Sequence, residues 1–438
     1  PFAKYKDNPA LALDPKPVAN PLRDGCLVGL LQLPGTIWRL WRIGSRAAKR
    51  AESFAVEYRS RIAPPIVAAA RAELARDYSG IDSKELLSSF TTWTERTLVE
   101  FARDSLKPTF FADAAWTALV DLLTPRLGEA RARAAVAELA LGAEPDADAN
   151  LAGSLLDLAN GRIDRATFLD RFGHRAAGEM ELAEPRWSED DAALRDLAPG
   201  SAKPKVDDGA FDRIVGEAKL AAPARSQAKL RHDQLHTYLG LRETAKHHLL
   251  LGYAVLRKLL LELDHRHRMN GDIFYLVPSE LDRVVAGVDL RPIAAARRAR
   301  QRLELGFEVP PVLFSDDLDA IGRPIPIPAG AVEFAGSPLS AGVAEGPALV
   351  LNDPSEAKGV PNGFVLVCPS TDPAWVPLFA RASALVMETG GVLSHGAIVA
   401  REFGLPAVAG LPAITRQIRS GQRVRVDGGT GRVAIVSV

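Results

Sequence analysis

The chain has 438 residues, and its 54 Lys and Arg balance its 54 Asp and Glu, so the formal net charge is zero. This balance gives no indication of nucleic acid or a membrane surface as a partner. Hydrophobic residues make up 47% and charged residues 25% of the chain, which is typical of globular proteins, and the length predicts two or three domains.

Helices are predicted for most of residues 1–314. An amphipathic helix follows Pro34-Gly35-Thr36 and is expected to end at Pro64-Pro65, because proline interrupts helices. A long helix is predicted from Leu230 to Arg268, where Asn270-Gly271-Asp272 ends it. Charges interrupt its most apolar part, so no membrane span is predicted. The other elements predicted here are a helix from Ser83, helices over Asp113–Leu123 and Leu127–Leu141, and a polar loop over residues 144–150.

A segment rich in Pro and Gly, residues 315–330, is predicted to be an extended, semi-rigid linker. Beyond it the pattern changes to short β-like runs, and a hairpin turn is predicted over residues 427–431. The predicted runs are Ala348–Leu351, Phe364–Cys368, Leu385–Met387 and Arg423–Val426. We therefore expect a multidomain protein, with a mostly α-helical domain over residues 1–314 and a compact α/β domain over residues 331–438.

The two cysteines, Cys26 and Cys368, are far apart and form neither a disulfide framework nor the spacing of a metal site. A reducing, cytoplasmic location is the expectation that follows.

Residues Thr389–Gly410 have the pattern of a strand end, a glycine loop, a helix and a tight exit. Ser394 is a good N-cap, which puts His395 in the first turn of a helix that Gly404 ends. Free N–H groups and the helix dipole stabilise an anion at such a turn. Space for a large phosphorylated partner beside the imidazole is expected from Gly390, Gly391 and Gly396.

His395 is therefore predicted to accept a phosphoryl group and pass it on. A neutral imidazole is both a nucleophile and a leaving group near pH 7, so a phosphohistidine divides one difficult transfer into two easier ones. The alternative is that Ser394-His395 is only a capping pair and the glycines only turn residues, which leaves the whole arrangement unexplained. No histidine lies between His267 and His395 or after His395, so the C-terminal domain has no second imidazole for a metal site.

The run resembles the mobile phosphohistidine domain of phosphoenolpyruvate-utilising enzymes. The signature is Thr-Gly-Gly, then Ser-His or Thr-His, then a helix ending Ala-Arg-Glu-x-Gly-x-Pro-Ala-Val, and the resemblance covers about Ala331–Val438. It implies a swivelling domain that carries phosphate between distant active sites. The details are most similar to rifampin phosphotransferases, which share Ser/Thr-His-Gly-Ala and the upstream run from Thr371 to Phe379. Leu393 stands where the dikinases have a regulatory threonine, which argues against that regulation here.

The order of segments supports this resemblance. In phosphoenolpyruvate synthases and pyruvate phosphate dikinases a pyruvate-binding barrel follows the histidine domain, whereas this chain ends about 43 residues after His395. Rifampin phosphotransferases place the histidine domain last, after a mostly helical acceptor domain, which corresponds to residues 1–314. The candidate phosphate- or substrate-binding residues of the motif are Thr389, Gly390, Gly391, Ser394 and Gly396.

Two further motifs in the helical part resemble the same family. The first is Phe172–Glu179, followed by Pro185-Arg186-Trp187, and its candidate site residues are His174, Arg175 and Glu179. It is either a substrate contact or a loop held by buried Arg–Glu pairs. The second is Leu241–Lys246, in which Arg242 and Lys246 are four residues apart and share a helix face. They are either two cations that converge on one phosphate or an ordinary charged face, and the resemblance favours phosphate binding.

Several other histidines crowd the long helix, and His232 and His236 form an i,i+4 pair of the kind that binds zinc. Asp233 follows His232 where the zinc-protease motif has Glu, and no third ligand is evident, so no metal site is predicted.

The sequence has neither a Gly-x-x-x-x-Gly-Lys-Ser/Thr loop nor a Gly-x-Gly-x-x-Gly fingerprint. The family's ATP-grasp domain, with its ATP and Mg²⁺, is expected before Pro1 or on a separate subunit, an arrangement similar to phenylphosphate synthase. The predicted function is then a dikinase-type phosphotransferase that phosphorylates a hydroxyl of a small organic acceptor, rifamycin-like or phenolic. The alternatives are a phosphoenolpyruvate synthase-like phosphocarrier subunit and a non-catalytic docking or regulatory protein.

Overall fold

The structure is a computed structural model, and it describes residues 50–437 except 177, 192–193, 195–208, 308–331, 358–359, 373–374 and 393. The helix expected after Pro34, the linker over residues 315–330, Cys26 and Leu393 lie outside the described residues. The chain divides into two compact units, Pro1–Phe54 and Ala55–Val438, and the second unit contains all the elements described below. No helix in the described part of the chain is long and apolar enough to cross a bilayer.

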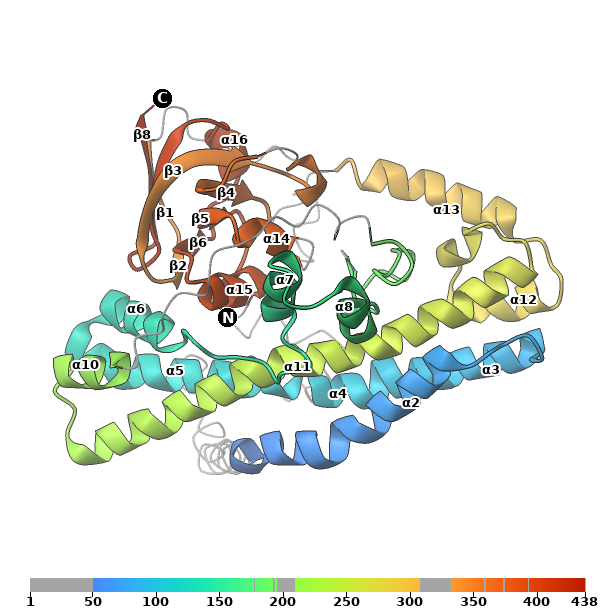
Figure 1. The fold of residues 1–438 in the computed structure, drawn as a ribbon, viewed down its shortest axis with the longest axis horizontal. Helices are drawn as coiled ribbons and strands as arrows, with labels where there is room; N and C mark the ends of the chain where they lie inside the picture. Colours follow the sequence, from blue (N-terminus) through green and yellow to red (C-terminus); the bar gives the residue numbers. More distant parts are fainter. Residues whose placement is uncertain are drawn as a thin grey trace, which may run out of the picture. The chain divides into compact units, whose positions relative to one another are not determined.

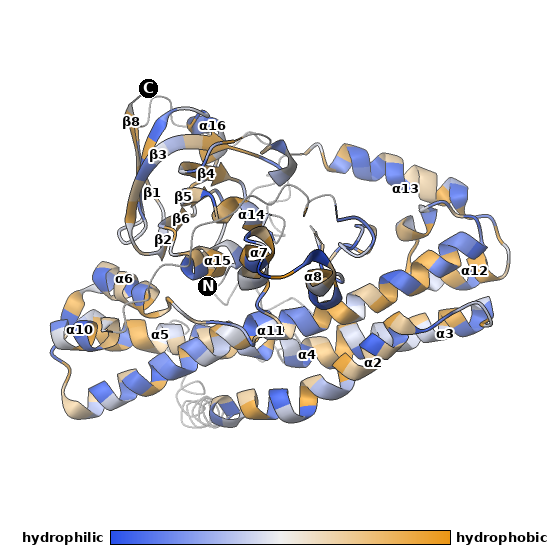
Figure 2. Cartoon of the chain, in the orientation of Figure 1, coloured by the Kyte–Doolittle hydropathy of each residue, from blue (hydrophilic) through white to orange (hydrophobic). Residues whose placement is uncertain are grey.

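The first part of this unit is helical, and its longest helix, α11, has 45 residues. Both apolar and polar residues lie along α2, α5 and α11 (Figure 2), and α2 and α5 each pack against α11 (Figure 1). In chain order the helices are η3 Tyr58–Ile62, α2 Ala63–Ala75, α3 Ser83–Thr94, η4 Glu95–Phe101, α4 Ala102–Ser105, α5 Lys107–Leu127, α6 Glu129–Leu139, α7 Leu151–Ala159, α8 Arg165–Phe172, α10 Ala210–Glu217, α11 Ala222–Arg266, η5 Asp272–Tyr275, η6 Pro278–Glu280, α12 Leu281–Val285 and α13 Arg291–Glu304.

The prediction that Pro64-Pro65 ends a helix is wrong. The chain stays helical through both prolines to Ala75, because they fall in the first turn of α2, and α2 directly follows the π-helical segment η3. The N–H of Ala63 reaches back to the carbonyl of Tyr58, and this wider turn accommodates the proline rings and their missing N–H groups.

Two predicted helix starts are too late: α11 begins at Ala222 instead of Leu230, and α5 begins at Lys107 instead of Asp113, because Pro223 and Pro108 lie in the first turns of these helices. Other boundaries follow their sequence signals. Asp82 caps α3 by accepting from the N–H groups of Lys84 and Glu85, so the helix starts at the predicted Ser83. After α11 the chain turns at Gly271, whose φ is +85° and whose N–H donates to the Asp264 carboxylate. The predicted loop over residues 144–150 crosses α11 closely, and the N–H of Asp146 donates to Thr244 Oγ1 at 2.9 Å.

The second part is built on an eight-stranded mixed sheet with the order β1-β8-β7-β3-β4-β5-β6-β2, in which β3, β4, β5 and β6 run parallel (Figure 1). The predicted β-like runs are all strands, and β7 and β8 form the predicted hairpin. The elements are β1 Glu333–Ala335, β2 Ser337–Ser340, β3 Val343–Val350, η8 Pro354–Glu356, β4 Phe364–Cys368, α14 Val376–Phe379, β5 Ala382–Met387, α15 His395–Phe403, β6 Ala407–Ala409, α16 Ile414–Gln417, β7 Arg423–Asp427 and β8 Arg432–Ser437.

The central strands β4, β5 and β6 are buried on both faces over most of their length, as their apolar residues require. Leu366 and Leu385 face one apolar core, and their neighbours Val365 and Val386 face the other. The second core is closed by β7, β8 and α16. The first contains residues of α14 and α15 together with residues of α7 and α8 from the helical part.

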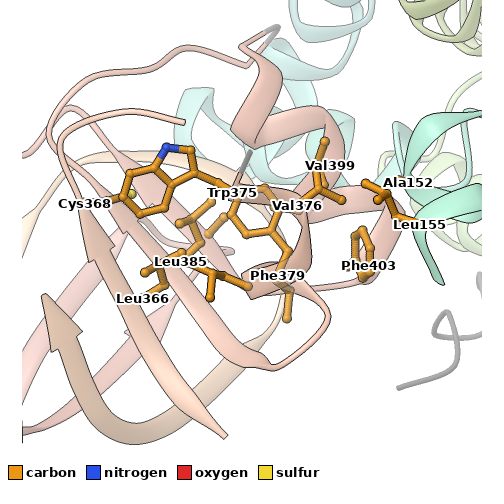
Figure 3. Close-up of a cluster of buried hydrophobic side chains, with 14 of the residues drawn as sticks. Ala152, Leu155, Leu366, Cys368, Trp375, Val376, Phe379, Leu385, Val399 and Phe403 are labelled. Atoms are coloured by element: carbon orange, nitrogen blue, oxygen red, sulfur yellow. The ribbon is translucent and has the colours of Figure 1, made fainter. Parts of the chain in front are cut away.

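Figure 3 shows where the two parts meet: Ala152 and Leu155 of α7 lie beside Val399 and Phe403 of α15. These side chains are at least nine-tenths buried. The helical part and the sheet therefore share one apolar core, and this core brings α15 against the helical part.

Candidate functional site

His395 begins helix α15, which connects the parallel strands β5 and β6. Beyond β5 the chain is held at Thr389, whose N–H and hydroxyl both donate to the carbonyl of Pro369, at 3.0 and 3.1 Å. Ser394 caps α15 by accepting from the N–H of Ala397, and Gly404, with φ +60°, ends the helix as predicted. The site thus lies at the carboxyl end of a parallel strand, where α/β sheets bind their ligands.

The three motif glycines have different surroundings. A Cβ on Gly391 would meet nothing within 4 Å, in agreement with the expected space beside the motif. Gly390 has φ +149°, a conformation that side chains disfavour. Gly396 does not match the expectation of space for a partner, because a Cβ there would lie 2.4 Å from Thr371 Oγ1 and 2.8 Å from Met387 Sδ. Its small size serves instead to pack the first turn of α15 against β5.

Arg401 fixes the loop that leads to His395. Its Nε donates to the carbonyl of Leu339 at 2.9 Å and its Nη2 to the carbonyl of Val392 at 2.5 Å, while its guanidinium lies over the ring of Trp116 in α5. Burial, with a smaller effect of Arg242, lowers the pKa of Arg401 to about 9. This arginine therefore connects the loop before His395 with the helical part.

Opposite His395, a buried ion-pair cluster joins α11 to the loop after α8. Glu179 accepts from Arg175 Nε at 2.5 Å, and its other oxygen lies 2.6 Å from Lys246 Nζ. Burial alone would raise the pKa of Glu179, but Arg175 and Lys246 outweigh it and lower the pKa to about 2. The carboxylate is thus ionised at neutral pH, and its two cations are held in place.

His395 faces this cluster. It shares a cavity of about 460 Å³ with Glu179, Lys246, Thr371 and Asp372, and a second, narrower one with Arg175 and Glu243. The residue is partly exposed, but both ring nitrogens are covered, and neither has a hydrogen-bond partner among the described residues. Burial and the nearby Lys246 lower the pKa of His395 to about 4, so the imidazole is neutral at pH 7.

Arg242 and Lys246 differ in position although they share a helix face. Lys246 lines the cavity with His395, whereas Arg242 contacts Glu243 Oε1 at 3.2 Å and lines neither of the two cavities. Burial raises the pKa of Glu243, but Arg242 and Lys246 lower it by more, so this carboxylate is also ionised. The two cations therefore do not converge on one point in this arrangement.

His174 lines neither of the two cavities that contain His395. Its Nε2 lies 3.2 Å from the carbonyl of His247, and the two rings meet edge to face at 4.5 Å. Burial lowers the pKa of His174 to about 3. The motif over residues 172–179 thus directs Arg175 and Glu179 toward His395 and His174 away from it.

The rings of His232 and His236 lie 4.4 Å apart, and His236 Nε2 lies 2.6 Å from the carbonyl of Leu139. Within the described residues no group of three or more His, Cys, Asp or Glu could hold a metal ion.

Sequence reasoning did not identify Glu243, Asp372 or Arg401 as site residues. Each has a signal in hindsight, since Glu243 lies between Arg242 and Lys246, and Asp372 and Arg401 lie in runs that carry the family resemblance. Asp372 accepts from the N–H of Gly178 at 3.3 Å and so connects the sheet to the loop that bears Glu179.

Comparison with known proteins confirms the resemblance to these families. Residues 360–431 match the mobile domain of PEP-utilising enzymes, and residues 125–243 match the fourth domain of rifampicin phosphotransferase. The first range contains His395, and the second contains His174, Arg175, Glu179 and Arg242.

Two curated relatives are rifampicin phosphotransferases. The chain is 35% identical to that of Streptomyces sviceus over 62% of this chain and 34% of the relative, and 32% identical to that of Bacillus cereus over 61% and 34%. The chain therefore spans about a third of the length of these relatives. Among solved structures, aconitase X of Thermococcus kodakaraensis aligns with 24% of this chain and 100% of its own, at 20% identity and a TM-score of 0.21.

Proposed function

We propose that this chain is the phosphoryl-transfer part of a dikinase-type phosphotransferase, in which His395 carries the phosphoryl group to a hydroxyl of a small organic acceptor. The observation that carries the proposal is a neutral imidazole at a helix N-terminus that faces Lys246, Arg175 and two carboxylates. The family resemblance and the relatives named rifampicin phosphotransferase support the same reaction class. The sheet over residues 331–438 is then the swivelling domain, and the helical part over residues 1–314 holds the acceptor.

In the first step an imidazole nitrogen of His395 attacks a donor phosphoryl group, so that a P–N bond forms and the donor P–O bond breaks. The depressed pKa of His395 keeps the nitrogen lone pair free of a proton at pH 7. The helix N-terminus stabilises the charge on the phosphoryl oxygens.

In the second step the P–N bond breaks and the acceptor oxygen bonds to phosphorus. We assign Lys246 to the transferring phosphoryl oxygens, because it lines the cavity beside His395 and is held by Glu179. The hydroxyl proton needs an acceptor, and we assign this role to Glu243, which lines the narrower cavity with His395 and is ionised. Arg242 then holds the Glu243 carboxylate.

The proposed acceptor carries a hydroxyl group. Its surface is partly apolar and partly polar, because Met180 lines the same cavity as Lys246 and Asp372. A rifamycin-like or phenolic compound meets this description, and the names of the relatives favour the first.

ATP and Mg²⁺ belong, on this proposal, to an ATP-grasp domain or subunit that loads His395 in the cytoplasm. The described residues do not fit a metal site of their own, because no three carboxylate, imidazole or thiol groups come together.

The test is mass spectrometry, under conditions that preserve phosphohistidine, of the chain incubated with its ATP-grasp portion and ATP. We expect phosphate on His395, no phosphate in His395→Ala, and normal loading of His265→Ala, a matched control in which an exposed histidine is removed. An unmodified His395, together with full acceptor phosphorylation by His395→Ala, would contradict the proposal and favour a docking or regulatory role.

A further inference from the structure

A second cavity, of about 590 Å³, lies among α2, α8 with its following loop, and the second half of α11. It shares no lining residue with the two cavities at His395. His174 lines it, while Arg175, the next residue, lines a cavity at His395, so the loop after α8 separates the two regions.

The cavity has an unusual polar wall. Arg186 is 2% exposed, and its Nη2 donates to the carbonyl of Glu181 at 3.3 Å. Its Nε and Nη1 are buried and have no hydrogen-bond partner among the described residues. Burial and the nearby Arg257 lower the pKa of Arg186, because the carboxylates around it do not outweigh them.

Arg186 differs in this from the other buried arginines of the helical part. Arg175 is paired with Glu179, and Arg257 makes three contacts with the Glu189 carboxylate at 2.6–3.0 Å. A buried guanidinium is costly unless its charge and its donors are matched. An oxyanion is the group that matches the fork of Nε and Nη donors best.

The remaining walls define the rest of the ligand. Arg71 and Lys258 add positive charge around the cavity, and Lys258 is oriented by the carbonyls of Leu74 and Arg76. Leu251 and Leu261 of α11 supply an apolar wall. Asp170 and Glu189 also line the cavity, but Glu189 is neutralised by Arg257.

We propose that this cavity is a binding site for a small organic anion, whose phosphate or carboxylate group bonds to Arg186 and whose apolar body packs against Leu251 and Leu261. Such a site is separate from the one at His395 and does not depend on the phosphotransferase proposal. His174 and its neighbour Gly173 form part of the wall of this site.

The experiment is a ligand-observed NMR titration of the chain with phenylphosphonate and with benzoate, with benzyl alcohol as the neutral probe. We expect saturable binding of at least one anion, at least tenfold weaker binding of benzyl alcohol, and a loss of tenfold or more in Arg186→Gln. The tighter of the two anions identifies the headgroup. Arg162→Gln, which removes an exposed arginine outside the cavity, and His395→Ala should both bind as the unchanged chain does.

Ala254→Leu tests the site without removing a charge, because Ala254 lines the cavity from α11 and a larger side chain narrows it. It should weaken the binding of the anion, as Arg186→Gln does. It also tests whether the anion binds in this cavity if Arg186→Gln fails to fold. Failure of both anions to bind, equal binding of benzyl alcohol, or unchanged binding in Ala254→Leu or in a folded Arg186→Gln would overturn the proposal.

Discussion

The Lys246 ammonium group lies 2.6 Å from the Glu179 carboxylate, and both residues line the cavity that contains His395. Lys246 comes from α11 and Glu179 from the loop after α8, so one buried ion pair fixes two elements around the imidazole. Glu179 also binds Arg175, and this shared carboxylate orders the cations that face His395.

Replacing Lys246 should impair transfer more than loading. In Lys246→Met the cation nearest to the phosphoryl oxygens is lost, and we expect acceptor phosphorylation to fall about 10²–10³-fold, as for the loss of one transition-state donor. The measurement is single-turnover transfer from isolated phospho-His395. Lys229→Met, which removes an exposed lysine of the same helix, is the control and should transfer normally. Equal rates for the two variants would remove Lys246 from the mechanism.

Replacing Glu179 should affect stability first. Glu179→Gln leaves the side chains of Arg175 and Lys246 without their shared anion, and breaking a buried pair in this way costs about 3–5 kcal/mol. Denaturant unfolding should therefore show a large decrease in the free energy of unfolding. Glu217→Gln is the control, because its pair with Arg131 is partly exposed, and such pairs contribute about 0–1 kcal/mol. Similar decreases in unfolding free energy in both variants would mean that Glu179 contributes no more to stability than an exposed ion pair does.

Acid should destabilise the protein before its carboxylates titrate. Folding lowers the pKa of His174 from 6.5 to about 3 and the pKa values of His232 and His395 to about 4. Below pH 6.5 the unfolded chain takes up protons that the native chain does not, so the free energy of unfolding falls as pH decreases toward 4. One such histidine accounts for a loss of about 2 kcal/mol between pH 7 and pH 5.

The check on this pH dependence is the difference in unfolding free energy between pH 7 and pH 5. His174→Gln should reduce that difference by about 2 kcal/mol, whereas His265→Gln, at an exposed position, should leave it unchanged. Glu179 does not interfere, since its lowered pKa removes stability only as pH falls below 4.5. An unchanged difference in His174→Gln would mean that this histidine is protonated in the native chain.

Two glycines of the motif offer a matched pair. In Gly396→Ala the new Cβ meets Thr371 and Met387, so the first turn of α15 must move, at a cost of about 1–3 kcal/mol and with at least tenfold slower loading of His395. Gly391→Ala adds the same atom where nothing lies within 4 Å and should load normally. Loading rates and thermal unfolding of both variants are the measurements. A strong defect in Gly391→Ala alone would instead indicate that a partner approaches at that glycine.

Local signals predicted the helix of His395, because the cap at Ser394 and the left-handed Gly404 act within a few residues. The residues that surround His395 were harder to predict. Periodicity along α11 indicated Lys246, but its pairing with Glu179 arises only when the loop after α8 folds back on that helix. Arg401 is a charged residue, a type that is rarely buried, and the contact of its guanidinium with Trp116 comes from α5, far away in the sequence.

The strands β1, β2 and β6 were not predicted, since three or four residues are too few to display an alternating pattern. The prediction at Pro64-Pro65 was wrong for another reason. A π-helical turn before the prolines accommodates them, so the helix continues where sequence rules place its end.

The contact of Ala152 and Leu155 with Val399 and Phe403 has a kinetic consequence. If the sheet shuttles between a donor and this acceptor site, these apolar surfaces must separate in every catalytic cycle and become hydrated while apart. The free energy of this apolar contact then determines the residence time of His395 at the acceptor site. The residence time in turn sets how often the phosphoryl group is transferred before the sheet moves away. A smaller side chain at Leu155, which is buried in this contact, would weaken the contact and shorten the time that His395 spends at the acceptor.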